Sequence, residues 1–271
     1  MSRRRLISER VMPGRALGQR RTTIAVVALV VALAGFGAAV ASPAAASTTY
    51  DVTATIPVGN LPVAVAVNQL TSRVYVANEE SNTVSVINPA KDAVTATIPV
   101  GTVPFAVAVN QLTGKVYVAN SGSNTVSVIN PITTAVTATI PVGSIPVGVA
   151  VDQLTGKVYV ASEGSNTVSV LNPATNAVGA TIAVGSGPMG VAVNQLAGKV
   201  YVGNAGSDTV SVINPATNAV TATIPVGRDT FGVAVNQLTG KIYVTNTLSN
   251  TVSVITPPGR QRRPRHHRPA R

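Results

Sequence analysis

The sequence predicts an all-β fold built from a tandemly repeated unit, and three observations support this. A tyrosine-centred motif recurs every 42 residues, at Tyr75, Tyr117, Tyr159, Tyr201 and Tyr243. Hydrophobic residues make up 45% of the chain and aromatic residues only 3%, so Val, Ile, Leu and Ala must form the core, a bias that favours strands. Short apolar runs alternate with clusters of Asn, Gly, Ser and Pro, which is typical of strands separated by turns.

Each unit contains four candidate strands. In the second copy the apolar runs cover residues 105–109, 116–119, 125–129 and 135–142. The clusters between them contain Asn, Pro, Gly and Ser, which supply the φ values and local hydrogen bonds of turns. No segment of 10–12 residues keeps a helical period between these breakers, so we expect no helix in the repeats.

The composition of each strand predicts its place in the sheet. The first strand is apolar and small on both faces, as in Ala106–Val109, which suits the position where space is tightest. The fourth strand carries Pro141, which has no N–H to donate and therefore suits an edge strand or a strand end. The five repeated tyrosines lie mid-strand between valines, and we expect them to fill the space between stacked sheets.

Four-stranded units of 40–45 residues that repeat radially form the blades of a β-propeller. The fifth copy ends after its third strand, at 251–255, whereas residues 52–58 repeat the sequence of a fourth strand. We therefore predict five antiparallel blades that the N-terminal strand closes into a ring, which removes an unpaired strand edge. The ring-closing residues of this latch are Val52, Ala54, Ile56 and Val58.

The repeat resembles the YVTN-type β-propeller repeat family. Residues Tyr243–Asn246 read YVTN, and the stretches SNTVSVI and TATIPVG and the proline before the first strand are also similar to that family. The match covers residues 51–257. The resemblance implies a bacterial or archaeal secreted or surface-layer-like propeller protein. Members of this family often have seven blades, so a truncated part of a seven-bladed propeller is the alternative.

The N-terminus has the features of a secretory signal. Seven arginines precede an apolar run at 24–41, and the A-x-A motif at 44–46 predicts cleavage between Ala46 and Ser47, with a second A-x-A motif at 39–41 that would place cleavage before Ser42. The run approaches the length of a membrane span, so an uncleaved membrane anchor is the alternative. The expected division is a signal peptide at 1–46, a propeller domain at 47–257 and a disordered basic tail at 258–271.

The net charge of +11 is concentrated at the two ends of the chain. Residues 1–46 carry +6 and residues 260–271 carry another +6, whereas residues 47–259 carry −1. The domain therefore shows no electrostatic signature of a nucleic-acid-binding protein. Only the basic tail offers a surface for an anionic polymer, a nucleic acid or a membrane.

The composition argues against the common catalytic constellations. Both histidines, His266 and His267, lie in the tail, and the chain has no Cys. A His-based metal site, a catalytic triad and a thiol nucleophile are therefore not expected in the repeats. We predict no catalytic residue, no metal site and no cofactor. Some propellers that are similar at the level of the fold are lactonases or lyases, so an enzyme of that kind is the alternative.

Comparison of the five copies singles out one face. The loops between strands one and two are nearly constant, whereas the loops between strands two and three and the links between blades vary. Variable loops on a rigid scaffold commonly carry binding functions, although loops that tolerate drift show the same pattern. The candidate ligand or partner residues are Glu79, Glu80, Glu163, Asp208, Arg228 and Asp229.

The sequence thus predicts an exported, non-enzymatic β-propeller that acts as a binding or cell-surface interaction scaffold. We expect it to be secreted, periplasmic or at the cell surface, to be a monomer, and to bind a protein or glycan whose identity the sequence does not specify. It contacts a membrane only if the N-terminal segment stays uncleaved. The alternatives are a lactonase-type or lyase-type enzyme and a truncated product without function.

Overall fold

The structure is a computed structural model that describes residues 50–258, so the expected signal segment and residues 259–271 lie outside the described residues. The chain divides into two units at Val52, and all described strands belong to the second unit. Every described element is a β-strand, apart from one 3-10 turn at Glu163–Ser165 in the second unit. The all-β prediction is confirmed. Within residues 50–258, no helix has the length and hydrophobicity to cross a membrane.

The strands form five antiparallel sheets, the blades, each with its strands in sequence order. Blade 1 contains β1 (Pro62–Val67), β2 (Val74–Asn78), β3 (Thr83–Asn88) and β4 (Ala93–Pro99). Blade 2 contains β5 (Pro104–Val109), β6 (Val116–Asn120), β7 (Thr125–Asn130) and β8 (Ala135–Pro141). Blade 3 contains β9 (Pro146–Val151), β10 (Val158–Ser162), β11 (Thr167–Asn172) and β12 (Ala177–Ala183).

The last two blades differ in their number of strands. Blade 4 contains β13 (Pro188–Asn194), β14 (Lys199–Asn204), β15 (Thr209–Asn214) and β16 (Ala219–Pro225). Blade 5 contains only β17 (Thr230–Val235), β18 (Ile242–Asn246) and β19 (Thr251–Ile255). Each complete blade has a bulge between its third and fourth strands, at Val86/Ile87 in blade 1. The bulge turns the start of the fourth strand toward the opposite face of the sheet.

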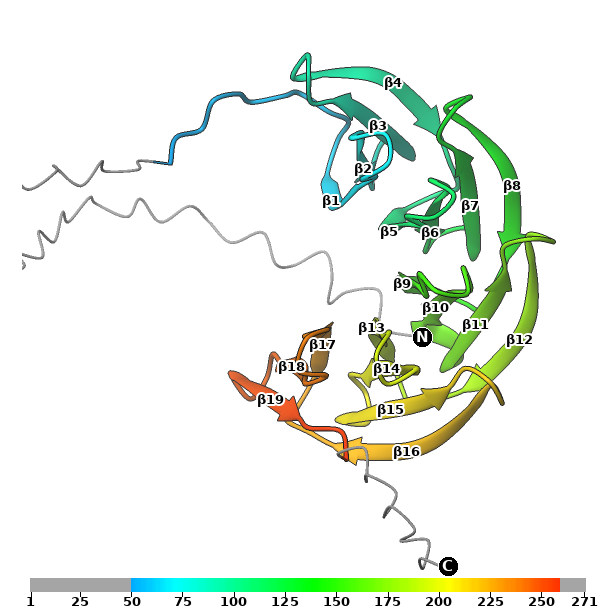
Figure 1. Ribbon diagram of the computed structural model, residues 1–271, viewed down its shortest axis with the longest axis vertical. Helices are drawn as coiled ribbons and strands as arrows, with labels where there is room; N and C mark the ends of the chain where they lie inside the picture. The colour runs from blue at the N-terminus through cyan, green and yellow to red at the C-terminus, as the bar shows by residue number, and fades with distance from the viewer. Residues whose placement is uncertain (1–49, 259–271) are drawn as a thin grey trace, which may run out of the picture. The chain divides into compact units, whose positions relative to one another are not determined.

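The blades follow one another around a common axis within the second unit (Figure 1). The first strands β1, β5, β9, β13 and β17 line the inner side, and consecutive ones are in contact. The fourth strands form the outer edge. Both positions agree with the sequence-based prediction. Small residues make the inner packing possible, since a Cβ on Gly148 would lie 2.1 Å from the carbonyl oxygen of Met189 in the next blade.

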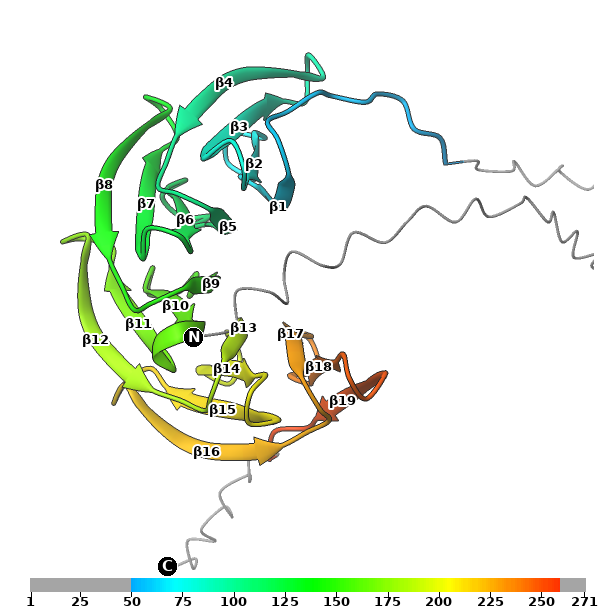
Figure 2. The ribbon, with the colours of Figure 1, turned by 180° about the vertical axis from the view of Figure 1, so that it is seen from behind.

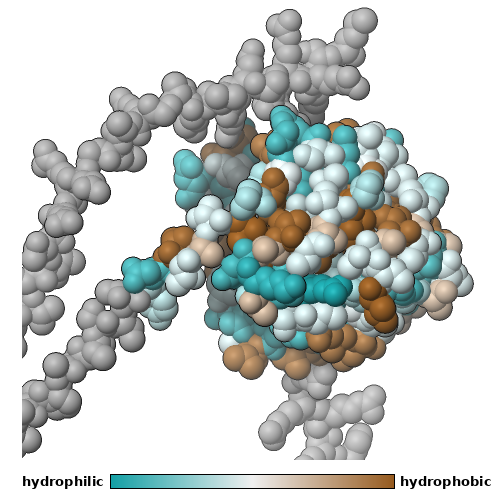
Figure 3. Space-filling view, turned by 90° about the horizontal axis from the view of Figure 1, so that it is seen from above, coloured by the Kyte–Doolittle hydropathy of each residue, from teal (hydrophilic) through white to brown (hydrophobic). Residues whose placement is uncertain are grey.

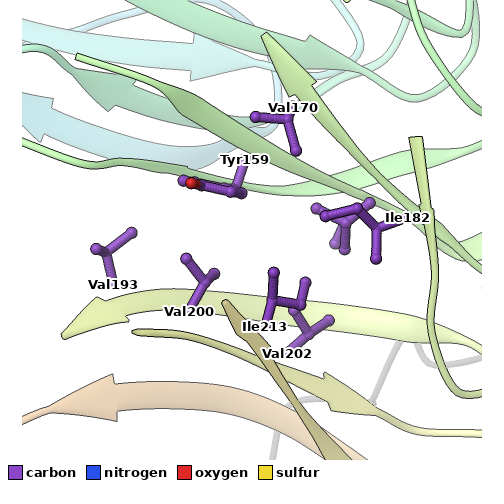
Figure 4. Close-up of a cluster of buried hydrophobic side chains, with 9 residues drawn as sticks. Tyr159, Val170, Ile182, Val193, Val200, Val202 and Ile213 are labelled. Carbon is purple, nitrogen blue, oxygen red and sulfur yellow. The ribbon is translucent and has the colours of Figure 1, made fainter. Parts of the chain in front are cut away.

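The hydrophobic core consists of layers between neighbouring blades. In the layer between blades 3 and 4, Tyr159, Val170 and Ile182 of blade 3 face Val200 and other apolar residues of blade 4 (Figure 4). Equivalent clusters lie between the other pairs of neighbouring blades. The tyrosines of blades 1 to 4 are buried, as predicted. The prediction for Tyr243 is wrong, because no described blade follows blade 5 to cover this side chain, which is 39% exposed.

The ring-closing strand that the sequence predicts is not formed. Residues 52–58, with Val52, Ala54, Ile56 and Val58, adopt no strand, and blade 5 remains three-stranded. Val52 is 86% exposed. The five-blade count is correct, but β1 and β17 stand at opposite ends of the row in both ribbon views (Figures 1 and 2).

The packing between blades explains this difference. Inner strands approach closely at small residues, whereas Tyr, Val and Ile side chains hold the middle and outer strands apart. Each interface is therefore a wedge, and the angle of the wedge sets how far the row turns from one blade to the next. The four wedges between the five blades do not bring blade 5 against blade 1, so the N-terminal segment has no sheet edge beside it.

Candidate functional site

The variable loops share one side of the blade row. In blade 1 the backbone N–H of Glu79, in the loop between strands two and three, donates to the carbonyl oxygen of Leu61 at 2.8 Å. The same bond joins Glu163 to Ile145 in blade 3 and Thr247 to Asp229 in blade 5. These bonds place each variable loop against the link that enters its blade. We call this surface the variable face.

A second bond ties each variable loop to the link that leads into the next blade. The side chain of Asn124 accepts a hydrogen bond from the backbone N–H of Ile145 at 2.8 Å. Asn124 has a φ of 56°, a left-handed conformation in which Asn is enriched among L-residues. In blade 4 the same position is Asp208, which has a φ of 56° and accepts from the N–H of Asp229 at 2.7 Å. Asp208 therefore has a structural role.

Asp229 is also engaged within the fold. Its carbonyl oxygen accepts from the backbone N–H of Thr247 at 2.9 Å and from the Thr247 hydroxyl at 3.1 Å. Its carboxylate accepts a further hydrogen bond from the same hydroxyl. Two of the six candidate residues thus have carboxylates that hold loops in place.

The other four candidates project charge from the variable face. Glu80 and Arg228 are exposed, and Glu79 and Glu163 are half-buried. The side chains of these four residues form no hydrogen bond or ion pair within residues 50–258. They belong to blades 1, 3 and 5, so the structure distributes them around the face. Within residues 50–258, no three His, Cys, Asp or Glu side chains lie close enough together to hold a metal ion.

On the opposite side of the blade row, the constant loops are joined by a ladder of glutamines. Gln111 of blade 2 accepts from the backbone N–H of Gln69 at 2.9 Å, and its Nε2 donates to the carbonyl oxygen of Val67 at 2.9 Å. Gln153 makes the equivalent bonds to Gln111 and Val109, at 2.8 and 3.0 Å. We call this arrangement the glutamine ladder. The sequence signal for it was the glutamine that occupies the same position in all five copies.

Asp152 is the one acid of this side that the fold buries, at 6% exposure, and it replaces the Asn of the other copies. It accepts from the backbone N–H of Leu154 at 2.9 Å and from the Thr155 hydroxyl at 2.7 Å. With the Gln195 amide in the orientation that satisfies both of its ends, Nε2 of Gln195 donates to Asp152 at 2.9 Å. The buried carboxylate is therefore fully partnered, and its surroundings do not require a ligand.

The basic residues of the constant loops also join blades. The Arg73 guanidinium donates to the carbonyl oxygen of Pro131 in blade 2 at 2.6 Å. Lys115 and Lys157 donate to the equivalent carbonyls, Pro173 and Pro215, both at 3.2 Å. The polar groups of this side therefore serve mainly to hold the blade row together, which leaves the variable face as the better candidate site.

Burial shifts the ionisation of the core tyrosines. Burial, and secondarily the nearby Asp152 carboxylate, raises the pKa of Tyr159 to about 12. Burial also raises the pKa of Tyr117 and of Tyr201 above the usual value. The hydroxyls of Tyr117 and Tyr159 have no hydrogen-bond partner among the described residues. A phenol held neutral in an apolar layer is not available for acid–base chemistry near neutral pH.

Comparison with known proteins identifies the fold. No protein-family model matches the chain, and no curated protein matches it. Two solved structures that it resembles are hydrazine synthase of Kuenenia stuttgartiensis and a functionally unknown protein of Desulfotomaculum acetoxidans DSM 771. The first has a TM-score of 0.61 and 18% identity over 77% of this chain and 70% of the other. The second has a TM-score of 0.64 and 16% identity over 73% and 70%.

The chain has a β-propeller fold. At these identities the likeness shows the fold alone, and solved chains that match number 1309, so the fold cannot by itself select a function. The activity named for hydrazine synthase belongs to that protein. Membership of the YVTN repeat family remains a prediction from the motifs.

Proposed function

We propose that this protein is an exported, non-enzymatic β-propeller of the YVTN-repeat type that binds a protein or glycan partner through its variable face. One observation carries the proposal. The variable loops keep the same backbone hydrogen bonds from blade to blade, while their side chains differ and point charge into solvent. A rigid frame with changeable side chains is the usual design of a binding surface.

The two sides of the blade row differ in how many of their polar side chains already have hydrogen-bond partners, and this difference supports the variable face as the binding surface. The Gln, Arg and Lys side chains of the constant side bind neighbouring blades, so substitution there alters the scaffold. On the variable face the carboxylates of Glu79, Glu80 and Glu163 have no partner in the described fold and remain available to one. Their charge favours a partner that presents basic groups or hydrogen-bond donors.

Export is the second part of the proposal. It is supported by the arginine-rich start, the apolar run at 24–41 and the A-x-A motif, all of which lie outside the described residues. Expression of the full chain in a bacterial host, followed by N-terminal sequencing of the exported product, tests it. A mature N-terminus at Ser47 supports the proposal. A full-length product that stays in the membrane would show that the segment is an anchor instead.

A ligand screen tests the binding function. The full chain is heated in the presence of glycans, lactones, divalent metals or duplex DNA, because a ligand at 100 times its Kd raises the free energy of unfolding by about 2.7 kcal/mol. Stabilisation by a glycan supports the proposal. Turnover of a lactone in the same samples would contradict it and favour the enzyme alternative.

Charge reversal then locates the site. The triple variant Glu79→Lys, Glu80→Lys and Glu163→Lys should lose at least about tenfold in affinity for any partner found in the screen. The matched control is Lys91→Glu, an exposed residue in the loop between strands three and four. Unchanged affinity in the triple variant would exclude the variable face.

A further inference from the structure

Blade 5 ends the row with an uncovered apolar face. Val252 is 56% exposed and Val254 is 52% exposed, and Tyr243 lies beside them. Their counterparts in blade 2, Val126 and Val128, are completely buried against blade 3. Blade 5 thus presents the surface that every other blade buries against its successor.

Blade 1 begins the row with the complementary surface. Val65 is 65% exposed and Val67 is 49% exposed. Their counterparts in blade 2, Val107 and Val109, pack against the Tyr75 layer of blade 1. Figure 3 shows apolar residues interspersed with polar ones on one side of the described fold. The two ends of the row therefore carry the two halves of one additional blade–blade interface.

The N-terminal segment and blade 5 are complementary as well. Residues 52–58 read VTATIPV, which is identical to residues 94–100 and 136–142 in the fourth strands of blades 1 and 2. Blade 5 has no fourth strand, so the outer edge of β19 pairs with no described strand. In blade 1, Val86 pairs with Ala96. The same register would pair Val254 with Ala54.

A groove between blades 4 and 5 lies where a valine of the fourth strand packs in a complete blade. It is lined by apolar residues that include Tyr201, Ala222, Ile224 and Ile255. In blade 2 the equivalent place is occupied by Val136, the first valine of the fourth strand, which packs into the layer between blades 1 and 2. Val52 is the corresponding valine of the N-terminal segment. Addition of that segment to β19 would fill this groove.

The first and last glutamines of the ladder each leave hydrogen-bonding groups without a partner, and the groups at one end are complementary to those at the other. The side chain of Gln69 has no hydrogen-bond partner in the described structure, although its counterpart Gln111 binds the preceding blade at two points. At the other end, no blade follows blade 5 within residues 50–258, so no described glutamine accepts from the backbone N–H of Gln237. A blade 5 placed before blade 1 would join these two open ends.

We propose that the protein associates head-to-tail with a second copy of itself. Residues 52–58 of one copy form the fourth strand of blade 5 in the other copy, and the exposed faces of blade 5 and blade 1 pack together. The interface uses the same strand pairing and apolar groups that join neighbouring blades within one chain. Its turn is smaller, because the five blades of one chain already curve around a common axis (Figure 1) and the second copy must clear them. Such a contact is heterologous, so copies form either a closed ring or an open row.

A second copy fits the observations better than the same chain does. The segment leaves blade 1 into the space where a preceding blade would lie, and its base is held there by the hydrogen bond of 2.6 Å from the Asn60 N–H to Ser81. Blade 5 of the same chain lies at the other end of the row (Figures 1 and 2). The proposal departs from the monomer that the sequence analysis expected.

Disulfide trapping tests the proposal in the full chain. The chain has no Cys, so engineered cysteines are its only thiols. One preparation carries Ala54→Cys, the other carries Val254→Cys, and the two are mixed and oxidised. Both positions are solvent-exposed, so neither change disturbs the core. Residues paired across two strands lie within the Cα separation that a disulfide spans, roughly 4.4–6.8 Å.

The proposal predicts a cross-linked product of twice the chain mass that forms only in the mixture. Adding Val252→Asp to the Val254→Cys chain should lower its yield at least about tenfold, because the charge would be buried at the interface. The control Leu154→Asp, an exposed loop position on the other side of the row, should leave the yield unchanged.

Two results would overturn the proposal. The first is no cross-linked product in the mixture, while each chain keeps its strand signal in circular dichroism. The second is an intrachain disulfide in the double variant Ala54→Cys, Val254→Cys, with no product between chains, which would show that one chain closes its own ring. Total mass is a weaker readout, because the apolar run at 24–41 can itself drive association.

Discussion

The side chain of Gln111 in blade 2 donates a hydrogen bond of 2.9 Å to the carbonyl oxygen of Val67 in blade 1. The same amide accepts from the backbone N–H of Gln69. A backbone carbonyl and N–H at the inner end of one blade are therefore satisfied by the next blade. The same pair of bonds joins blades 2 and 3 and blades 4 and 5, whereas the Gln195 amide of blade 4 accepts from the Gln153 N–H and donates to Asp152 of blade 3. Each blade therefore depends on its successor as well as on the apolar layer between them.

Removal of one step of the ladder should weaken the fold. Gln111→Ala loses two hydrogen bonds between blades, and we expect a loss of about 1–3 kcal/mol in the free energy of unfolding, measured by urea denaturation. Gln69→Ala is the matched control, because the Gln69 side chain has no partner in a single chain. At dilution it should change stability by less than about 0.5 kcal/mol. Equal losses in both variants would contradict the structural role of the ladder.

Much of this fold could be predicted from the sequence, because a blade is a local unit. The turn clusters and the apolar runs determine where strands begin and end, and Pro141 marks the fourth strand as the outer one. Ring closure could not be predicted in this way. It depends on the angle between blades, which arises from side-chain packing at every interface and accumulates along the row. The identity of residues 52–58 with a fourth strand says nothing about that angle.

The candidate site was predictable as a face but not in its individual charges. The variable loops lie together, as the pattern of constant and variable loops indicates. Asp208 and Asp229 stay candidates, but the fold also uses both carboxylates, because Asp208 accepts from the Asp229 N–H and Asp229 accepts from the Thr247 hydroxyl. Alignment of the five copies contains a signal for Asp208, because its counterparts are all Asn, including Asn82 and Asn124. Both residue types tolerate the left-handed conformation and accept a hydrogen bond.

The structural role of Asp208 gives a direct test. Asp208→Asn keeps an acceptor for the Asp229 N–H and restores the residue of the other copies, so we expect no loss of stability. Asp208→Ala removes the acceptor and should cost about 1–2 kcal/mol in the free energy of unfolding. Urea denaturation of both variants checks this. If Asp208→Asn loses partner binding at full stability, its charge belongs to the binding site after all.

The buried hydroxyl of Tyr117 contributes nothing favourable to the fold. It lies between blades without a hydrogen-bond partner among the described residues. Tyr117→Phe should leave the free energy of unfolding unchanged or raise it by up to about 2 kcal/mol, because the penalty of burying an unpaired hydroxyl disappears. Tyr117→Ala should lose about 3–5 kcal/mol through the cavity that it leaves. Tyr243→Ala is the control and should lose less, since that side chain is partly exposed. A destabilised Tyr117→Phe would reveal a partner for the hydroxyl.

The same burial makes the propeller sensitive to alkali. Burial, assisted by Asp152, raises the pKa of Tyr159 to about 12, whereas a tyrosine in the unfolded chain titrates near 10. Above pH 10 the unfolded chain releases a proton that the folded chain retains, so stability falls as pH rises from about 10 to about 12. Below pH 10 this residue adds no pH dependence. The slope is about 1.4 kcal/mol per pH unit for each such tyrosine.

Tyr75, Tyr117 and Tyr201 have raised pKa values as well, chiefly through burial, so their contributions add to this slope. We expect tyrosine ionisation, followed by absorbance at about 295 nm, to coincide with the loss of strand signal in circular dichroism. The control Tyr159→Phe should move the midpoint of alkaline unfolding upward, because one proton-linked group is removed. Ionisation of Tyr159 near pH 10 with the strands intact would contradict its burial, since a charged phenolate in a dry apolar layer is strongly disfavoured.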